Sequence, residues 1–296
     1  MEISVAITVH GVAQGVGFRP FIYRNAIALG LSGYVKNRGD AVVEITVKGN
    51  KHSIQEMVKR IEEEHPPPAS IEKVEVKPTE ARIPSGFQIL KSDKTVAASG
   101  STIPADISVC NKCLAELRTQ GDRRHRYFFI TCTECGPRFT IIEDLPYDRE
   151  NTSMKDFKLC RECQLEYADP SNRRFHAQTI ACNEYGPTVK LTENDGKVME
   201  TKSPIEDAGK LVEEGYIVAI KGNGGYHIAS SAIKSEPIER LRMAKHRTQK
   251  PFAVMARDIV AAKGFANISE SEEETLSSPV KPILLAKLKK DAVISG

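Results

Sequence analysis

The N-terminal part of the chain switches between two hydrophobic spacings, one typical of strands and the other of helices. Residues 3–9 alternate apolar and polar side chains, as a half-buried strand does. Further strands are predicted at 33–37, 41–48 and 71–77, helices at about 20–29 and 52–64, and a turn at 37–40. The order βαββαβ predicts a ferredoxin-like sheet with helices on one face, in a domain at residues 1–91.

The C-terminal third has a second pattern of elements. Residues 191–203 are polar and predict a linker, and a helix is expected over 204–214 with Ser203 at its N-cap. An apolar strand at 216–220 then leads into the glycine-rich run 221–225. This alternation of helix and strand predicts an α/β domain at 203–296, so that the whole chain is an α+β multidomain protein.

Composition places the chain among ordinary globular proteins. It has 296 residues, 40% hydrophobic and 27% charged, enough for two or more domains with real cores. The net charge of +3 is too small to indicate a nucleic-acid partner. No apolar run is long enough to span a membrane, and no signal peptide is visible, so we expect a soluble cytoplasmic protein with no membrane partner.

The cysteines reveal an internal repeat. Two CxxC pairs are separated by 18 residues, and the same pattern returns 50 positions later with its last cysteine missing. This predicts two modules, 110–135 and 160–185, within a region at 105–190. The cysteines are Cys110, Cys113, Cys132 and Cys135 in the first module, and Cys160, Cys163 and Cys182 in the second.

Paired CxxC motifs about 20 residues apart are typical of a tetrahedral zinc site with four cysteine ligands. The alternatives are disulfides or a redox-active CxxC. The regular repetition of the motif in a chain expected to be cytoplasmic disfavours disulfides. We therefore predict zinc as the cofactor of the first module.

The second module lacks its fourth cysteine, because Tyr185 stands where the repeat requires one. Either His176, Glu184 or water supplies a fourth ligand, or this site is weak or empty. His176 is the best local candidate because imidazole binds zinc well. The alternative for His176 is an ordinary packed or surface histidine.

Charge indicates what the repeated region does not bind. Residues 105–190 contain 13 basic and 13 acidic side chains, so they carry no net charge. A module that binds nucleic acid should have a basic surplus. The region is therefore predicted to be structural or to dock proteins.

The segment 10–19 is a glycine-rich loop between a predicted strand and a predicted helix. Glycines let backbone N–H groups converge on an anion, and the helix dipole favours such binding. Arg19 at the end of the loop can bind a phosphate through two hydrogen bonds. The alternative is a tight structural turn with a surface arginine.

The runs Val9–Arg19 and Gly33–Asn37 resemble the two signature motifs of acylphosphatases. This resemblance implies that Arg19 binds the substrate phosphate and that Asn37 orients the attacking water. It also implies a phosphate-binding loop formed by Gln14, Gly15, Val16, Gly17 and Phe18. An acyl phosphate is already activated, so this reaction needs no nucleophilic side chain.

Four further segments extend the likeness: 101–106, 135–142, 145–149 and 173–178. Together with the acylphosphatase-like domain they resemble the HypF family of nickel–iron hydrogenase maturation. The resemblance implies a carbamoyltransferase that hydrolyses carbamoyl phosphate, forms carbamoyl adenylate with ATP and magnesium, and transfers the carbamoyl group to the C-terminal cysteine of HypE. The chain departs from the family at Tyr185.

A cluster of cations follows the C-terminal glycine run. On composition alone this is a solvated basic helix end. The cluster also resembles the nucleotide-binding motif of YrdC-like domains, which implies that Lys245, Arg247 and Lys250 bind ATP. Lys221 would lie in the substrate loop of that domain.

A complete YrdC-like domain needs roughly 180 residues, within the usual size of a domain. Only about 95 follow Ser203. We therefore expect a partial YrdC-like domain, no transferase domain, and retention of only the acylphosphatase step. A different class of function stays open, in which the chain is a non-catalytic zinc-ribbon scaffold that docks a protein.

Overall fold

The computed structural model describes residues 2–38, 42–92, 104–247 and 249–294. Parts of two predicted features, 39–41 at the turn between strands and 101–103 in one family-like segment, lie outside the described residues. The chain divides into two compact units, residues 1–187 and 188–296. None of the described helices is long and apolar enough to cross a membrane.

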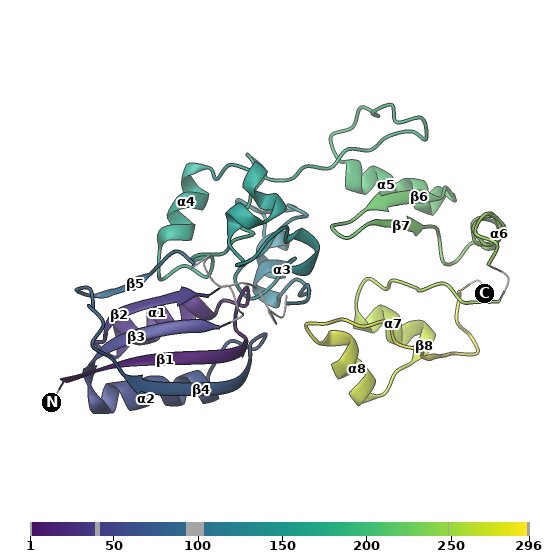
Figure 1. Cartoon of the computed structure of the whole chain (residues 1–296). Coiled ribbons are helices and arrows are strands. Elements are labelled where there is room, and N and C mark those ends of the chain that lie inside the picture. The colour runs from purple at the N-terminus through teal and green to yellow at the C-terminus, as the bar shows by residue number, and fades with distance from the viewer. Residues whose placement is uncertain (1, 39–41, 93–103, 248, 295–296) are drawn as a thin grey trace. The chain divides into compact units, whose positions relative to one another are not determined.

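The first unit begins with the predicted ferredoxin-like sheet (Figure 1). Its strands are β1 (Glu2–Val12), β2 (Ser32–Asn37), β3 (Val43–Asn50) and β4 (Ser70–Pro78). β1 pairs antiparallel with β3 and β4, and β2 pairs antiparallel with β3. A further strand, β5 (Phe87–Ile89), pairs parallel with β2, which gives the order β4-β1-β3-β2-β5. Three residues carry too little pattern for β5 to be predicted.

Two helices, α1 (Phe18–Ala28) and α2 (Lys51–Glu63), cover one face of this sheet. The alternation predicted for β1 is real, since every second side chain from Val5 to Val9 is buried. These side chains join Ile22 of α1 and Met57 of α2 in one core. Each such burial contributes about 1.5–3 kcal/mol, so the core fixes the register of β1 and thereby the loop that follows it.

α1 begins two residues earlier than the predicted boundary at Pro20. Gly17 adopts a left-handed conformation, with φ of 78°, immediately before the helix. A glycine tolerates this conformation, so the chain turns sharply there and Phe18 becomes the first helical residue. Arg19 is therefore in the first turn of the helix and not in the loop.

The cysteine-rich region repeats its local structure as its sequence predicts. α3 (Asn111–Arg118) begins directly after Cys110, and α4 (Arg161–Ala168) directly after Cys160. In each case the cysteine sulfur accepts a hydrogen bond from the backbone N–H three residues later. Three short 3-10 helices, η1 (Phe139–Ile141), η2 (Arg149–Asn151) and η3 (Ser153–Asp156), connect the two modules.

The second unit contains α5 (Pro204–Glu214), β6 (Val218–Lys221), β7 (Tyr226–Ala229), α6 (Ser235–Ala244), α7 (Ile259–Phe265), β8 (Ala266–Asn267), α8 (Glu270–Ser277) and β9 (Lys287–Leu288). β6 and β7 form an antiparallel hairpin around the glycine-rich turn. The buried apolar side chains include Ile238 and Leu241 of α6, whereas Met255 and Leu285 are almost fully exposed. This unit therefore has a much smaller core than the first.

Candidate functional site

The glycine-rich loop connects the end of β1 to the first turn of α1. The first N–H groups of a helix have no acceptor within the helix, so they are available to an anion. Close packing explains two of the glycines. A Cβ on Gly15 would lie 3.1 Å from the Tyr147 ring, and one on Gly17 would lie 3.2 Å from Thr133. The cysteine-rich region thus packs directly against the loop.

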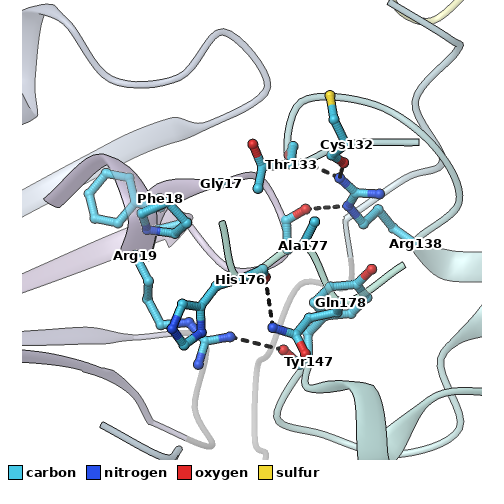
Figure 2. Close-up of a pocket in the computed structure, with 13 residues that line it drawn as sticks. Gly17, Phe18, Arg19, Cys132, Thr133, Arg138, Tyr147, His176, Ala177 and Gln178 are labelled. Carbon is cyan, nitrogen blue, oxygen red and sulfur yellow. Dashed lines mark hydrogen bonds between the residues drawn. The ribbon is translucent and has the colours of Figure 1, made fainter. Parts of the chain in front are cut away.

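Arg19 points into a pocket that the loop shares with the cysteine-rich region (Figure 2). Only 8% of the residue is exposed. Its Nη2 donates to Asp148 Oδ1 at 2.7 Å and to the backbone carbonyl of Tyr147 at 3.3 Å. Its Nη1 donates to Ser92 Oγ at 3.4 Å, and the Ser92 hydroxyl donates to the second oxygen of Asp148.

Asn37, at the end of β2, is 1% exposed. Within the described part of the chain, neither its Oδ1 nor its Nδ2 has a hydrogen-bond partner. Leaving a buried polar group unpaired costs about 1–3 kcal/mol. The amide can therefore donate to and accept from a small polar molecule, although Asn37 is not among the described residues that line the Arg19 pocket.

The cysteine-rich region supplies the other wall of the pocket. Its contribution includes Thr133, Arg138, Tyr147, His176 and Gln178 (Figure 2). Burial, helped by the positive charge of Arg19, lowers the pKa of His176 to about 4. The imidazole is therefore neutral at pH 7. Burial likewise raises the pKa of Tyr147.

Arg138 connects this wall to the loop. Its side chain is 2% exposed, and its Nε donates to the Gly15 carbonyl. Its Nη2 donates to the backbone carbonyls of Thr133 at 3.0 Å and Cys132 at 3.4 Å. One buried guanidinium therefore links the glycine-rich loop to the backbone of a cysteine of the first module.

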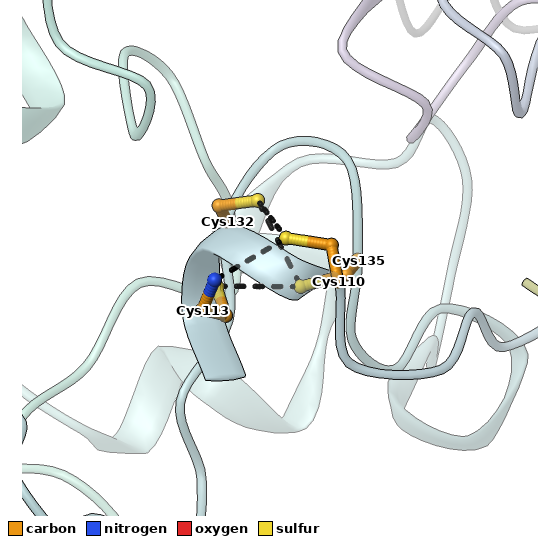
Figure 3. A group of neighbouring side chains, drawn as sticks. All are labelled: Cys110, Cys113, Cys132 and Cys135. Atoms are coloured by element: carbon orange, nitrogen blue, oxygen red, sulfur yellow. Dashed lines mark hydrogen bonds between the residues drawn. The ribbon is translucent and has the colours of Figure 1, made fainter. Parts of the chain in front are cut away.

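The four cysteines of the first module converge on one point (Figure 3). The sulfur separations are 3.8 Å for Cys110–Cys132, 3.7 Å for Cys132–Cys135 and 3.5 Å for Cys113–Cys135. Zinc–sulfur bonds of about 2.3 Å in a tetrahedron place the sulfurs about 3.8 Å apart. The arrangement fits a tetrahedral zinc ion closely.

The second module brings Cys160, Cys163 and Cys182 together in the same way. Cys160 and Cys182 have their sulfurs 3.6 Å apart. His176 is not in this group. It lies in the Arg19 pocket, against the rings of Phe175 and Tyr167, so the structure gives it a place other than that of a metal ligand.

Glu184 is the remaining side-chain candidate for the fourth ligand of the second module. A carboxylate oxygen of Glu184 lies within 4.8 Å of the Cys160 sulfur and of a Glu162 oxygen, but Glu184 does not share one group with all three cysteines. Tyr185, at the position of the missing cysteine, is 53% exposed. The side chain that replaces the cysteine thus lies largely in solvent.

The predicted nucleotide-binding residues lie in the second unit. Lys245 caps the C-terminus of α6, and Lys250 is exposed five residues later. The Arg247 guanidinium lies 5.1 Å from the centre of the Phe252 ring and donates to the Pro251 carbonyl at 2.9 Å. Lys221 lies 4.9 Å from the centre of the Tyr226 ring, across the hairpin from β6 to β7.

Family models match the chain in three places. The acylphosphatase model matches residues 5–89, the HypF finger model matches 109–142 and 159–192, and the telomere recombination model, which describes Sua5- and YrdC-like domains, matches 210–295. Fold and site thus define an acylphosphatase domain followed by a duplicated metal-binding finger and a YrdC-like domain. That combination is what the sequence resemblance implied.

Relatives identify the family. Carbamoyltransferase HypF2 of Cupriavidus necator is 45% identical over 295 residues, which cover 99% of this chain and 36% of that protein. The probable carbamoyltransferase HypF of Methanocaldococcus jannaschii is 47% identical over 292 residues, 98% of this chain and 38% of that protein. The chain belongs to the HypF family, and it spans little more than a third of the length of these relatives.

A solved structure agrees with this assignment. It is described as full-length HypF in the phosphate- and nucleotide-bound form. It is 40% identical to this chain, with a TM-score of 0.90, and the match covers all of this chain and 39% of that one.

Proposed function

We propose that this chain hydrolyses carbamoyl phosphate to carbamate and phosphate in the pocket at Arg19. The observation that carries the proposal is the pocket itself, where the guanidinium of Arg19 meets the glycine loop at the start of α1. A phosphoryl group bound there can accept hydrogen bonds from the guanidinium and from the helix N–H groups.

Asn37 is the residue we assign to the water. Its buried amide has both a donor and an acceptor unused among the described residues, so it can hold a water molecule in a fixed orientation. The water oxygen forms a bond to phosphorus as the bond from phosphorus to the carbamate oxygen breaks. Carbamate leaves, and the proton of the water passes to solvent. Arg19 stabilises the charge that develops on the phosphoryl oxygens.

The later steps belong to the whole protein and rest on the family. We propose that the YrdC-like domain combines carbamate with ATP and magnesium into carbamoyl adenylate and pyrophosphate. We assign Lys245, Arg247 and Lys250 to the phosphates of ATP. Transfer to the C-terminal cysteine of HypE would follow. The solved relative with phosphate and nucleotide bound supports such sites in the family.

We also propose zinc as the metal of both fingers, with Glu184 as the fourth ligand of the second. The donor set and the sulfur separations of the first module support zinc. With four cysteine ligands the first ion has no open position. Its role is therefore structural, and it shapes the wall of the pocket.

The proposed reaction can be tested by phosphate release from carbamoyl phosphate. Arg19→Ala should lower kcat/KM by 10²-fold or more, as is typical when a group that stabilises a transition state is removed, an effect of about 3–4 kcal/mol. Arg82→Ala is the matched control, because Arg82 is an exposed arginine of the same domain. Equal rates in wild type and Arg19→Ala would disprove the assignment of Arg19.

A second candidate function is a non-catalytic docking scaffold. It is favoured by two large apolar side chains that the finger region exposes, Phe139 in η1 and Leu165 in α4. It predicts no turnover of acyl phosphates, together with saturable binding of a partner protein that chelators abolish. Turnover that depends on Arg19 would favour the first proposal.

A further inference from the structure

The two finger modules exchange arginine side chains. Each module carries an adjacent pair between its cysteine motifs, Arg123–Arg124 in the first and Arg173–Arg174 in the second. The pairs are 50 residues apart, like the cysteines. Each pair contacts the cysteines of the other module and not those of its own.

Arg173 illustrates the exchange at the first site. Its Nη2 donates to the Cys113 sulfur at 3.0 Å, and its Nη1 approaches the Cys110 sulfur at 3.9 Å. Its Nε donates to Glu116 at 2.8 Å. The adjacent Arg174 also pairs with Glu116, and its Nε donates to the Thr131 carbonyl at 2.9 Å.

The same contacts recur at the second site, shifted by 50 residues. Arg123 donates to the Cys160 sulfur at 3.0 Å and to the Cys163 sulfur at 3.4 Å. Arg124 pairs with Glu166, and its Nε donates to the Ala181 carbonyl at 2.9 Å. Both glutamates lie on the helix that starts at their module's first cysteine.

A metal held by thiolates explains why the arginines are there. A zinc ion with four thiolates carries a formal charge of −2, and three of the four cysteines of the first module are buried. A buried charge is costly unless it is paired and hydrogen-bonded. N–H groups of arginine that donate to the sulfurs supply both the charge and the hydrogen bonds, as outer-shell groups do at metal sites.

We propose that the exchanged arginines complete the two metal sites, so that metal in one module strengthens metal binding in the other. Metal in the second module orders the loop that carries Arg173, and Arg173 then stabilises the thiolates of the first site. In the same way, metal in the first module orders the loop that carries Arg123, and Arg123 then stabilises the thiolates of the second site. Because such linkage is reciprocal, each metal raises the affinity of the other by the same factor. This inference concerns metal binding and does not depend on turnover.

The test uses the full chain loaded with cadmium-113. The nuclear resonance of each cadmium reports its own site, because four sulfur ligands and three sulfur ligands give different chemical shifts. A chelator is then added stepwise, and the loss of each resonance is followed. In Arg173→Ala, the site with four sulfurs should lose metal at roughly 10- to 100-fold lower chelator concentration, the usual cost of removing an outer-shell partner. In Arg123→Ala, the site with three sulfurs should be the one that loses its metal at the lower chelator concentration.

The controls are Arg118→Ala on α3 and Arg161→Ala on α4, both exposed arginines of the two modules. Both should release cadmium as wild type does. The linkage itself is tested by Cys160→Ser with Cys163→Ser, which removes the second site and should weaken the intact first site.

Two results would overturn the proposal. One is that Arg173→Ala weakens only the site of its own module, or neither site. The other is that the first site binds cadmium with wild-type affinity after the second is removed. If Arg173→Ala does not fold, Arg173→Gln is the second variant, because glutamine keeps an amide N–H donor but loses the positive charge. Unchanged affinity of the first site in that variant would equally contradict the proposal.

Discussion

Arg19 and Asp148 form an ion pair between the acylphosphatase domain and the finger region, with Nη2 and Oδ1 2.7 Å apart. The two residues are 129 positions apart in the chain. The carboxylate binds the guanidinium that we assign to the phosphoryl group of the substrate. A carboxylate and a phosphate compete for the N–H donors of a guanidinium, so we expect Asp148 to weaken the binding of phosphate at Arg19.

Asp148→Asn should therefore tighten phosphate binding. A hydrogen bond to a charged group contributes about 1.5–3 kcal/mol. Removing the charge of Asp148 weakens its competition for Arg19, so the affinity for inorganic phosphate should rise by roughly tenfold or more. Isothermal titration calorimetry with inorganic phosphate measures this affinity in wild type and variant. Asp156→Asn, at an exposed acidic residue of η3, is the control. Weaker phosphate binding in Asp148→Asn would mean that Asp148 orients Arg19 and does not compete with the substrate.

Arg138 should link the first metal site to turnover. Its guanidinium bonds both the Gly15 carbonyl and the backbone at Cys132, so Arg138→Ala leaves several buried carbonyls unpaired. We expect a loss of about 3–5 kcal/mol in the free energy of unfolding, because each buried carbonyl left unpaired costs about 1–3 kcal/mol, and a large drop in phosphate release. Denaturant unfolding and the turnover assay measure the two effects. Arg118→Ala should change neither.

Removing the metal should lower turnover through the same contact of Arg138 with the glycine-rich loop. A chelator that empties the first site should lower phosphate release in wild type. Arg138→Ala, where the connection is already broken, should lose little further activity. If wild type keeps its full rate after complete metal removal, the finger does not shape the pocket.

His176 should make the stability of the first unit depend on pH. Its pKa is about 4 in the folded chain, below the ordinary value of 6.5, mainly because it is buried. Burying the neutral ring stabilises the folded chain by an amount that is fully present above pH 6.5. This part of the free energy of unfolding is lost as the pH falls from 6.5 towards 4, because the unfolded chain then binds the proton more readily. The total loss is on the order of 3 kcal/mol.

His176→Asn is the informative variant, because asparagine tolerates the left-handed backbone at this position, where φ is 55°. The difference in denaturation midpoint between wild type and variant should shrink as the pH falls from 7.5 to 4.5. A difference that is constant over this range would show that the histidine does not titrate with a depressed pKa. Acid also releases metal from both proteins, and the comparison between them cancels that effect.

Much of the fold follows from local patterns in the sequence. The alternation in β1 and the helical spacing of α2 each depend on neighbouring residues, so both elements could be predicted. The start of α1 could not be placed, because the left-handed conformation of Gly17 depends on how the loop packs against Thr133. The repeat of 50 residues predicted both thiol clusters, since each module supplies its own cysteines.

Contacts between segments that are far apart in the chain could not be predicted from the sequence. Asp148 and Arg138 lie in segments that resemble the family, but nothing in their spacing indicates a contact with Arg19 or Gly15. The arginine pairs follow the same repeat as the cysteines, yet a repeat does not say which module each pair faces. His176 was a reasonable ligand by chemistry alone. Its position in the pocket is set by packing against Tyr167 and Phe175, which the sequence pattern does not encode.

The most direct test of the proposed hydrolysis compares Asn37→Ala with wild type, with phosphate release from carbamoyl phosphate and binding of inorganic phosphate measured on the same samples. If Asn37 holds the attacking water while Arg19 and the loop hold the phosphate, phosphate should still bind to Asn37→Ala with nearly wild-type affinity. Its kcat should fall by roughly 10²-fold or more, the scale expected for losing a positioning group. Unchanged turnover in Asn37→Ala, or a wild-type chain that releases no phosphate from carbamoyl phosphate, would contradict the account.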